Sequence, residues 1–243
     1  MGKVYAELDE RLAKFISRQP VFFVATAPCL TEDGDGGHVN LSPKGYRDTF
    51  AVLGPRRVAY VDLTGSGAET IAHLRQNGRI TIMFCSFAKQ AKILRIYGRG
   101  RVVLPGDADW AELAPRFAAN AGEGADRRDR RSIIVVDVDR IADSCGYAVP
   151  LMELSSEREL LARNAERQSP EELAAYRAKY NAASIDGLPA LTNGTRASRG
   201  DSRPPRGERE AQLRNEAFGN DLHAERPAGA ERLTARNVGH LHV

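Results

Sequence analysis

Cysteine is scarce in this sequence, and the three that occur, Cys29, Cys85 and Cys145, lie far apart. This is too few for a disulfide framework, and no CxxC pair or His/Cys cluster has the spacing of a metal site. No apolar run approaches the roughly 20 residues of a membrane span, and the N-terminus lacks the apolar core of a secretory signal. We expect a soluble, cytoplasmic protein without a metal centre.

The sequence also lacks a strong excess of either charge, because it has 35 basic and 32 acidic side chains and a formal net charge of +3. This balance gives no signature of a nucleic-acid partner. The chain has 243 residues, of which 42% are hydrophobic. That is enough for one domain of about 150 residues with appendages, and not for a second full domain.

What is present is a series of β-rich runs between His38 and Leu104, interrupted by one short helix. The first run, His38–Ser42, alternates polar and apolar residues, and Pro43–Gly45 is expected to end it. One face of this strand would carry His38, Asn40 and Ser42, with Lys44 just beyond its end. Three further runs are rich in β-branched and aromatic residues, at 57–63, 80–84 and 93–104.

The short helix follows the segment Thr64-Gly65-Ser66-Gly67 directly after the strand at 57–63. Ser66 followed three residues later by Glu69 has the pattern of a capping box, and Asn77-Gly78 would end the helix. The sequence therefore predicts a strand-turn-helix element at 57–78.

Flanking segments complete the expected layout. Apolar residues at helical spacing predict an amphipathic helix over 4–18, and a second helix is expected between Asp107 and Phe117. Short strands are expected at 133–138 and 141–147, followed by helices, one of which begins at Ser169-Pro170.

The last segment, 192–243, differs in character from the rest. It has nine arginines against seven acids and few aromatic or β-branched residues, which predicts disorder. A frameshift or an extended reading frame is one hypothesis for this abrupt change in composition. His240 and His242 lie in this tail, where a metal site is not expected because metals need preorganised ligands.

The order and spacing of these segments resemble the pyridoxamine 5′-phosphate oxidase-like family of flavin-binding split barrels. The segments that carry the resemblance are VFFVATAP, HVNLSPKGYRDTF, RVAYVDLTGSGAETIAHLRQNGRITIMF, ILRIYGRGRVVLPGD and IIVVDVDRIADSCGYAVP. The resemblance covers roughly residues 1–191. It implies a mainly β fold with flanking helices, a split β-barrel at 1–150 and a helical extension at 151–191. It also implies FMN (flavin mononucleotide) as cofactor, held at the interface of a homodimer.

By this resemblance the FMN phosphate lies near the strand-turn-helix element. A helix N-terminus offers free amides and the positive end of a dipole, so the candidate phosphate ligands are Thr64, Ser66, the Gly67 amide and Thr70. Alternatively, Ser66 and Glu69 only cap the helix. The basic residue that many relatives carry on this helix is missing. Lys44 is the first candidate cation, followed by Arg95 and then Arg75, for which a surface role is the better reading.

The flavin ring needs an apolar surface and hydrogen-bond partners for its pyrimidine edge. Asn40, Ser42 and Lys44 are candidates for that edge, and Asp62 and Leu63 complete the expected shell, although Asp62 fits a structural role equally well. We expect Cys145 to be a small buried residue, Tyr147 to be either a wall of the site or a packing residue, and His73 to be at the surface. His38 is more readily a surface residue than a pocket residue.

No nucleophile or acid-base pair stands out, so no catalytic residue is assigned. The first functional hypothesis is an FMN-dependent oxidoreductase acting on an unidentified small molecule. Pyridoxamine phosphate itself is not the expected substrate, because the chain lacks the arginine-rich cofactor strand and the arginine-bearing C-terminal signature of the true oxidases. The alternative is a non-catalytic carrier of flavin, deazaflavin or haem on the same fold.

Overall fold

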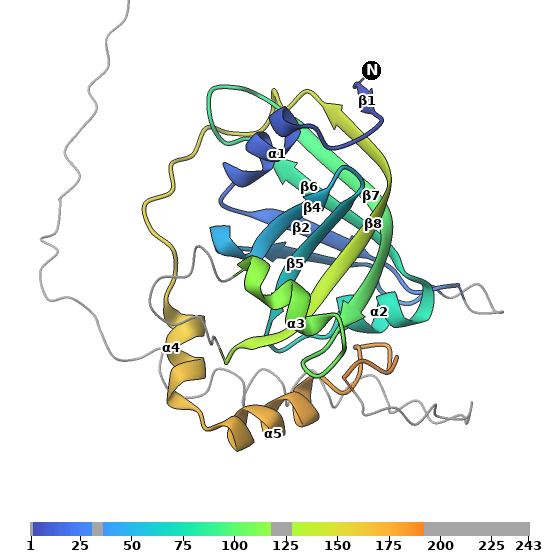
Figure 1. Ribbon diagram of the computed structural model, residues 1–243, viewed down its shortest axis with the longest axis vertical. Helices are drawn as coiled ribbons and strands as arrows, with labels where there is room; N and C mark the ends of the chain where they lie inside the picture. The colour runs from blue at the N-terminus through green and yellow to red at the C-terminus, as the bar shows by residue number, and fades with distance from the viewer. Residues whose placement is uncertain (1, 31–35, 118–127, 192–243) are drawn as a thin grey trace, which may run out of the picture. The chain divides into compact units, whose positions relative to one another are not determined.

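Eight β-strands form one antiparallel sheet that curls without closing. The computed structural model describes residues 2–30, 36–117 and 128–191, and its ribbon is drawn in Figure 1. The strands are β1 (Val4–Tyr5), β2 (Phe22–Thr26), β3 (Asn40–Lys44), β4 (Phe50–Gly54), β5 (Arg57–Leu63), β6 (Arg79–Cys85), β7 (Ile93–Val103) and β8 (Arg130–Ser144). Their order in the sheet is β3-β2-β6-β7-β8-β5-β4, and β1 pairs with β8. Strands β3 and β4 are the two ends of this order and do not pair, which is the opening of a split barrel.

Five α-helices flank the sheet in the described residues. They are α1 (Glu10–Ser17), α2 (Glu69–Asn77), α3 (Trp110–Leu113), α4 (Leu160–Arg167) and α5 (Pro170–Tyr180), and short 3₁₀ helices lie at Arg47–Thr49 (η1) and Ala114–Phe117 (η2). The fold class predicted from the sequence, a mainly β split barrel with flanking helices, is confirmed. None of the helices within the described ranges is long and apolar enough to span a membrane.

Strand β5 and the first half of β8 are buried on both faces, which explains the apolar runs Val58–Val61 and Ile133–Val136. On β5, Val58 and Tyr60 point into the main core cluster, while Ala59 and Val61 belong to a second cluster on the other face. Side chains of α3 and η2, including Leu113 and Phe117, cover this second face, and Figure 1 shows α3 against these strands.

Several predicted boundaries change. The helix expected over 4–18 begins only at Glu10, because the Asp9 carboxylate caps it by accepting the Leu12 N–H at 2.9 Å. The two strands expected at 133–138 and 141–147 are one strand, β8, whose pairing with β7 shifts by one residue near Tyr97 and Gly98. Strand β4 was not predicted.

The C-terminal residues up to Leu191 pack on the barrel. Ala190 is fully buried in the main core cluster, and Leu188 and Leu191 pack against it. The extension at 151–191 thus shares the core of the barrel. The domain boundary at residue 150 stays a prediction. The tail predicted to be disordered, 192–243, lies outside the described residues.

Candidate functional site

Strand β3 presents three polar side chains to the inner face of the sheet. Asn40, Ser42 and Lys44 alternate with the exposed residues Leu41 and Pro43. In the register with β2 they stand opposite Thr26, Val24 and Phe22, which are buried. The alternation predicted from the sequence is confirmed.

The predicted end of this strand is wrong. Strand β3 continues through Pro43 to Lys44 and does not stop at Ser42. Proline is tolerated here because β3 is an edge strand, paired only with β2, so the missing N–H breaks no ladder. His38, which was expected to share the polar face, precedes the strand.

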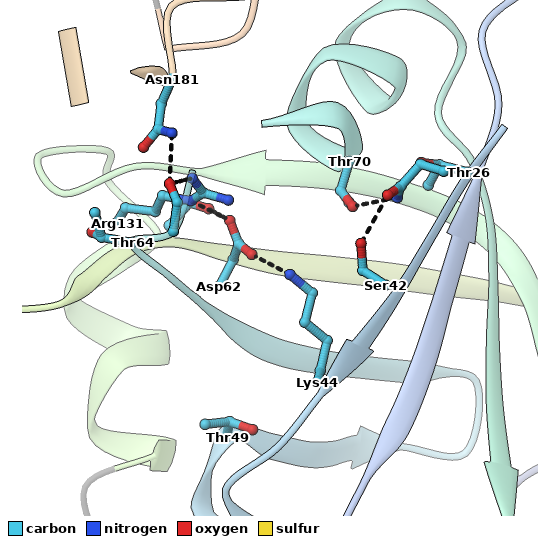
Figure 2. Close-up of polar contacts among 12 residues, drawn as sticks. Thr26, Ser42, Lys44, Thr49, Asp62, Thr64, Thr70, Arg131 and Asn181 are labelled. Carbon is cyan, nitrogen blue, oxygen red and sulfur yellow. Dashed lines mark hydrogen bonds and ion pairs between the residues drawn. The ribbon is translucent and has the colours of Figure 1, made fainter. Parts of the chain in front are cut away.

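A charged cluster sits at the end of β5, opposite Lys44. The fully buried Asp62 accepts from Lys44 Nζ at 2.9 Å through one carboxylate oxygen and from Arg131 Nε at 2.7 Å through the other (Figure 2). Burial alone would raise the pKa of Asp62, but the charges of Lys44 and Arg131 and their hydrogen bonds outweigh it and hold that pKa well below its usual range. Two cations thus surround one carboxylate, and the cluster has a net positive charge.

A second, uncharged network lies beside this cluster. Asn40 Nδ2 lies 3.1 Å from both Thr26 Oγ1 and Thr70 Oγ1, and Ser42 Oγ donates to Asn40 Oδ1 at 2.8 Å (Figure 2). Thr26 Oγ1 also lies 3.0 Å from Nδ1 of His73. The network connects β3, β2 and the first turn of α2. We use the name groove for the region of the fold that holds this network and the Asp62 cluster.

His73 was predicted to be at the surface, and this is wrong. Its side chain is fully buried on α2, and burial lowers its pKa, although the charge of Asp186 and a hydrogen bond with the Thr26 backbone act in the opposite direction. Thr26 on β2 provides a hydrogen-bond partner for the Nδ1 atom, whereas Nε2 is buried without a hydrogen-bond partner among the described residues.

The turn between β5 and α2 has an exposed and an engaged part. Ser66 and Gly67 are exposed, whereas Thr64 is buried. Thr64 Oγ1 donates to the Asp129 carbonyl at 2.9 Å and accepts from Arg177 Nε at 2.9 Å. Thr70 is buried and bonded to Asn40. Of the four predicted phosphate ligands, the exposed pair is therefore the more accessible.

The predicted capping box at Ser66 is wrong. Helix α2 begins at Glu69, its N-cap is Ala68, and no side chain caps it. The Glu69 carboxylate instead accepts the Ile185 N–H, with both oxygens 3.2 Å from the nitrogen. Ser66 is thus left without the capping role that was the alternative to ligand binding.

Residues of α5 and of the segment that follows it hold this turn in place through hydrogen bonds. Asn181 Nδ2 donates to the Gly65 carbonyl at 2.8 Å (Figure 2), and Arg177 binds Thr64 and the carbonyls of Arg128 and Arg130. Asp186 Oδ1 lies within hydrogen-bond distance of His38 Nδ1, at 2.7 Å. Sequence reasoning missed Arg131, Arg177 and Asn181, because only the folded chain brings positions more than 60 residues apart together.

Other predicted site residues lie away from the groove. Leu63 packs on the second core cluster, on the face opposite to Asp62, so only its backbone is available. Arg95 donates to Ser144 Oγ at 3.0 Å, and no hydrogen bond or ion pair within the described part of the chain joins it to the groove. Arg75 and Tyr147 are exposed. Cys145 is exposed too, so its predicted burial is wrong.

The open, curled sheet and its polar groove define a split-barrel protein with a net positive site. The chain belongs to the pyridoxamine 5′-phosphate oxidase family: the model described as "Pyridoxamine 5'-phosphate oxidase" matches residues 8–145. The pyridoxamine 5′-phosphate oxidase family protein ustO of Aspergillus flavus is 40% identical over 206 residues, which cover 79% of each chain.

Solved structures with a similar fold are more distant. HutZ, the heme storage protein from Vibrio cholerae, shares 17% identity with a TM-score of 0.42, covering 58% of this chain and 97% of that one. An FMN-binding protein from Syntrophomonas wolfei shares 13% identity with a TM-score of 0.39, covering 54% of this chain and 82% of that one.

Proposed function

We propose that this protein binds FMN in the groove and uses it in an oxidoreductase reaction on a small molecule. The observation that carries the proposal is the convergence of β3, the end of β5 and the start of α2. There Lys44 Nζ lies 2.9 Å from Asp62 Oδ1, and Asn40 bonds to Thr70 on α2. In a chain of this family, these are the elements expected to hold the phosphate and the ring edge.

The residues present fit a phosphate group. Ser66 and Gly67 are exposed before the first turn of α2, and a Cβ atom added at Gly65 or Gly67 would meet nothing within 4 Å, so the turn is open on this side. Helix α2 contributes free first-turn amides, and Lys44 and Arg131 provide positive charge in excess of Asp62. Glu69 opposes an anion, but its carboxylate is turned to the Ile185 amide.

The neutral network fits the polar edge of a flavin ring. Asn40 and Ser42 are half-buried and joined to one another, so their donors and acceptors are held in fixed positions. Asp62 remains ionised at neutral pH and orients Lys44 toward the groove. Bound FMN would supply the capacity to accept and donate a hydride, and the chain would supply binding and orientation.

The absorption spectrum of the purified protein tests the cofactor, recorded before and after incubation with FMN and desalting. Flavin bands at about 370 and 450 nm that remain after desalting would support the proposal. A protein that stays colourless after incubation would overturn it. Riboflavin, which has the same ring without the phosphate, is the control and should be retained less well.

A non-catalytic carrier is the second candidate, and one feature of the groove favours it. Its carboxylate, Asp62, is held ionised by two cations and is not available as a proton donor at neutral pH. Oxidation of NADH, NADPH or pyridoxamine phosphate by the flavin-loaded protein would support the enzyme. A bound flavin inert to all three would support the carrier. The groove donors are hydroxyls, an amide and an amine, a set better suited to a flavin than to haem iron.

We also propose that the protein is a homodimer with the cofactor at the interface. Val39, just before β3, and Leu41, on β3, alternate in sequence with the polar residues of the site. Both side chains face solvent, with exposed fractions of 74% and 65%. Large apolar side chains on an edge strand favour association with a second copy. The interface would then lie on the other face of the strand that lines the groove.

A further inference from the structure

A separate cavity opens at the split of the barrel. It has a volume of about 800 Å³ and lies between α1, β4 and the η1 connection that joins β3 to β4. Strands β3 and β4 are the two end strands of the sheet and do not pair with each other, so no backbone hydrogen bonds between them close this gap. The volume is within the range of small-molecule sites in proteins, roughly 300 to 1,000 Å³.

The inner wall of the cavity is aromatic. Phe22, Phe50 and Phe84 contact one another with ring centroids 5.0 to 5.7 Å apart. Two aliphatic side chains, Ile16 from α1 and Val52 from β4, line the cavity beside them. This wall suits the apolar, ring-bearing part of a ligand.

Two cations and two carboxylates line the cavity, and they differ in whether they have partners. Lys14 and Arg47 line it and are exposed, and neither side chain has a hydrogen-bond or ion-pair partner among the residues that the structure describes. The carboxylates that also line it, Asp48 and Glu157, both have partners, and Glu157 accepts the Arg47 backbone N–H at 3.2 Å. An acidic group on a ligand could therefore pair with Lys14 and Arg47, whose side chains have no other partner in the described part of the chain.

We propose that this cavity binds an anionic amphipathic small molecule, with its ring system against Phe22, Phe50 and Phe84 and its acidic group near Lys14 and Arg47. The site is distinct from the flavin site, because none of the candidate cofactor residues lines the cavity. The two are neighbours, however. Phe22 is the register partner of Lys44, so the cavity wall and the Lys44 side chain share one face of the β2–β3 pair. The proposal does not depend on flavin binding.

Two fluorescent probes with related ring systems test the proposal on the full-length protein. The anionic probe is 8-anilinonaphthalene-1-sulfonate, and the uncharged probe is N-phenyl-1-naphthylamine. Titration should give one site per chain for each probe, with tighter binding of the anionic one. Binding of many probe molecules per chain, or of none, would overturn the proposal.

Cavity-filling variants locate the probe. Val52→Trp and, as a second variant on a different element, Ala13→Phe place a larger side chain in the cavity and should each weaken both probes at least tenfold. Ile185→Trp, at a residue that is 63% exposed and outside the cavity, is the matched control and should bind like the wild type. Unchanged probe binding in whichever of the two filled variants folds would contradict the assignment.

Charge variants test the acidic group. The double variant Lys14→Gln/Arg47→Gln should weaken the anionic probe about three- to tenfold and leave the uncharged probe unchanged. The control Lys3→Gln/Arg11→Gln removes the same net charge at residues outside the cavity and should change neither probe. Equal effects of both double variants would contradict a local anion site. If Val52→Trp instead changes the oligomeric state in sedimentation, the cavity is filled by a second copy and the proposal fails.

Discussion

Lys44 Nζ lies 2.9 Å from Asp62 Oδ1, and this ion pair joins β3 to β5, two strands that share no backbone pairing. Asp62 is in turn bound to Arg131 on β8 at 2.7 Å. Side chains therefore connect β3, at one end of the open sheet, to β5 and β8 on the far side of the split. We infer that this cluster holds β3 in position relative to β5 and β8.

The first prediction concerns the charge of Asp62. In Asp62→Asn the buried Arg131 and the mostly buried Lys44 lose their counter-charge, and we expect a loss of about 3 to 5 kcal/mol in the free energy of unfolding, measured with urea. Asp137→Asn is the matched control, because its ion pair with Arg57 is more than half exposed. It should cost less than about 1 kcal/mol. Similar losses in the two variants would contradict the assigned role of Asp62.

The same residue predicts a dependence on pH. Since the pKa of Asp62 is lower in the folded chain than in the unfolded one, its contribution is present above the unfolded pKa, near 4, and is lost as the pH falls below it. The stability difference between wild type and Asp62→Asn should shrink by up to about 1.4 kcal/mol per pH unit below pH 4. A difference that stays constant from pH 6 to pH 3 would show that the carboxylate is not held ionised by the fold.

The second prediction concerns Lys44 as a ligand of the cofactor. A charge-assisted hydrogen bond is worth about 1.5 to 3 kcal/mol, so Lys44→Gln should weaken FMN binding by about ten- to a hundredfold in fluorescence titration. Lys89→Gln, at an exposed lysine outside the groove, should leave FMN binding unchanged. Wild-type affinity in Lys44→Gln would remove this residue from the site.

How much of this site the sequence predicts depends on how far apart in the chain the interacting residues are. The period of two in β3 places Asn40, Ser42 and Lys44 on one face, because alternation is local. The capping of α5 was predicted for the same reason, and Ser169 accepts the Glu172 N–H as expected. The strand predicted at 57–63 has those bounds in the structure.

The failures concern residues whose partners are distant in sequence. Glu69 was assigned to a local capping box, but its partner is the amide of Ile185, 116 residues away. His73 was placed at the surface because it was assigned to the polar side of its helix, whereas Thr26, 47 residues away, is its hydrogen-bond partner in the interior. No local pattern contains this information.

The third prediction follows from the burial of His73. Its pKa is lowered in the folded chain, chiefly by burial, so the stability it contributes is present above the unfolded pKa of about 6.5 and is lost as the pH falls below it. The slope of unfolding free energy between pH 7 and pH 5 should therefore be smaller in His73→Gln than in the wild type. His38→Gln, at an exposed histidine, is the comparison for the loss of a ring. An unchanged slope in His73→Gln would mean that this ring does not titrate as a buried group.

The fourth prediction concerns the hydrogen bond from Asn181 to the turn between β5 and α2. Asn181 is fully buried and its amide holds the Gly65 carbonyl, so Asn181→Ala should cost about 1 to 3 kcal/mol of stability. Hydrogen exchange should also become faster at the Thr64 amide, which donates to the Asp129 carbonyl at the start of the turn, because the turn loses its anchor. Asn164→Ala, at an exposed position of α4, should change neither quantity. Faster exchange spread evenly over the barrel would indicate a general loss of stability instead of a local anchor.

The last prediction tests the proposed dimer through the outward face of β3. Leu41 is 65% exposed beside Val39, so Leu41→Glu places a charge in the proposed interface and should shift the protein toward monomers in sedimentation and light scattering. If residues of both copies build the cofactor site, these monomers should also lose FMN on desalting. Leu160→Glu introduces the same charge at another exposed apolar residue, on α4, and should keep both the dimer and the flavin. Stable Leu41→Glu monomers with one FMN per chain would contradict a cofactor held between subunits, because the groove of a single copy would then be sufficient. An unaffected dimer would place the interface on a different surface.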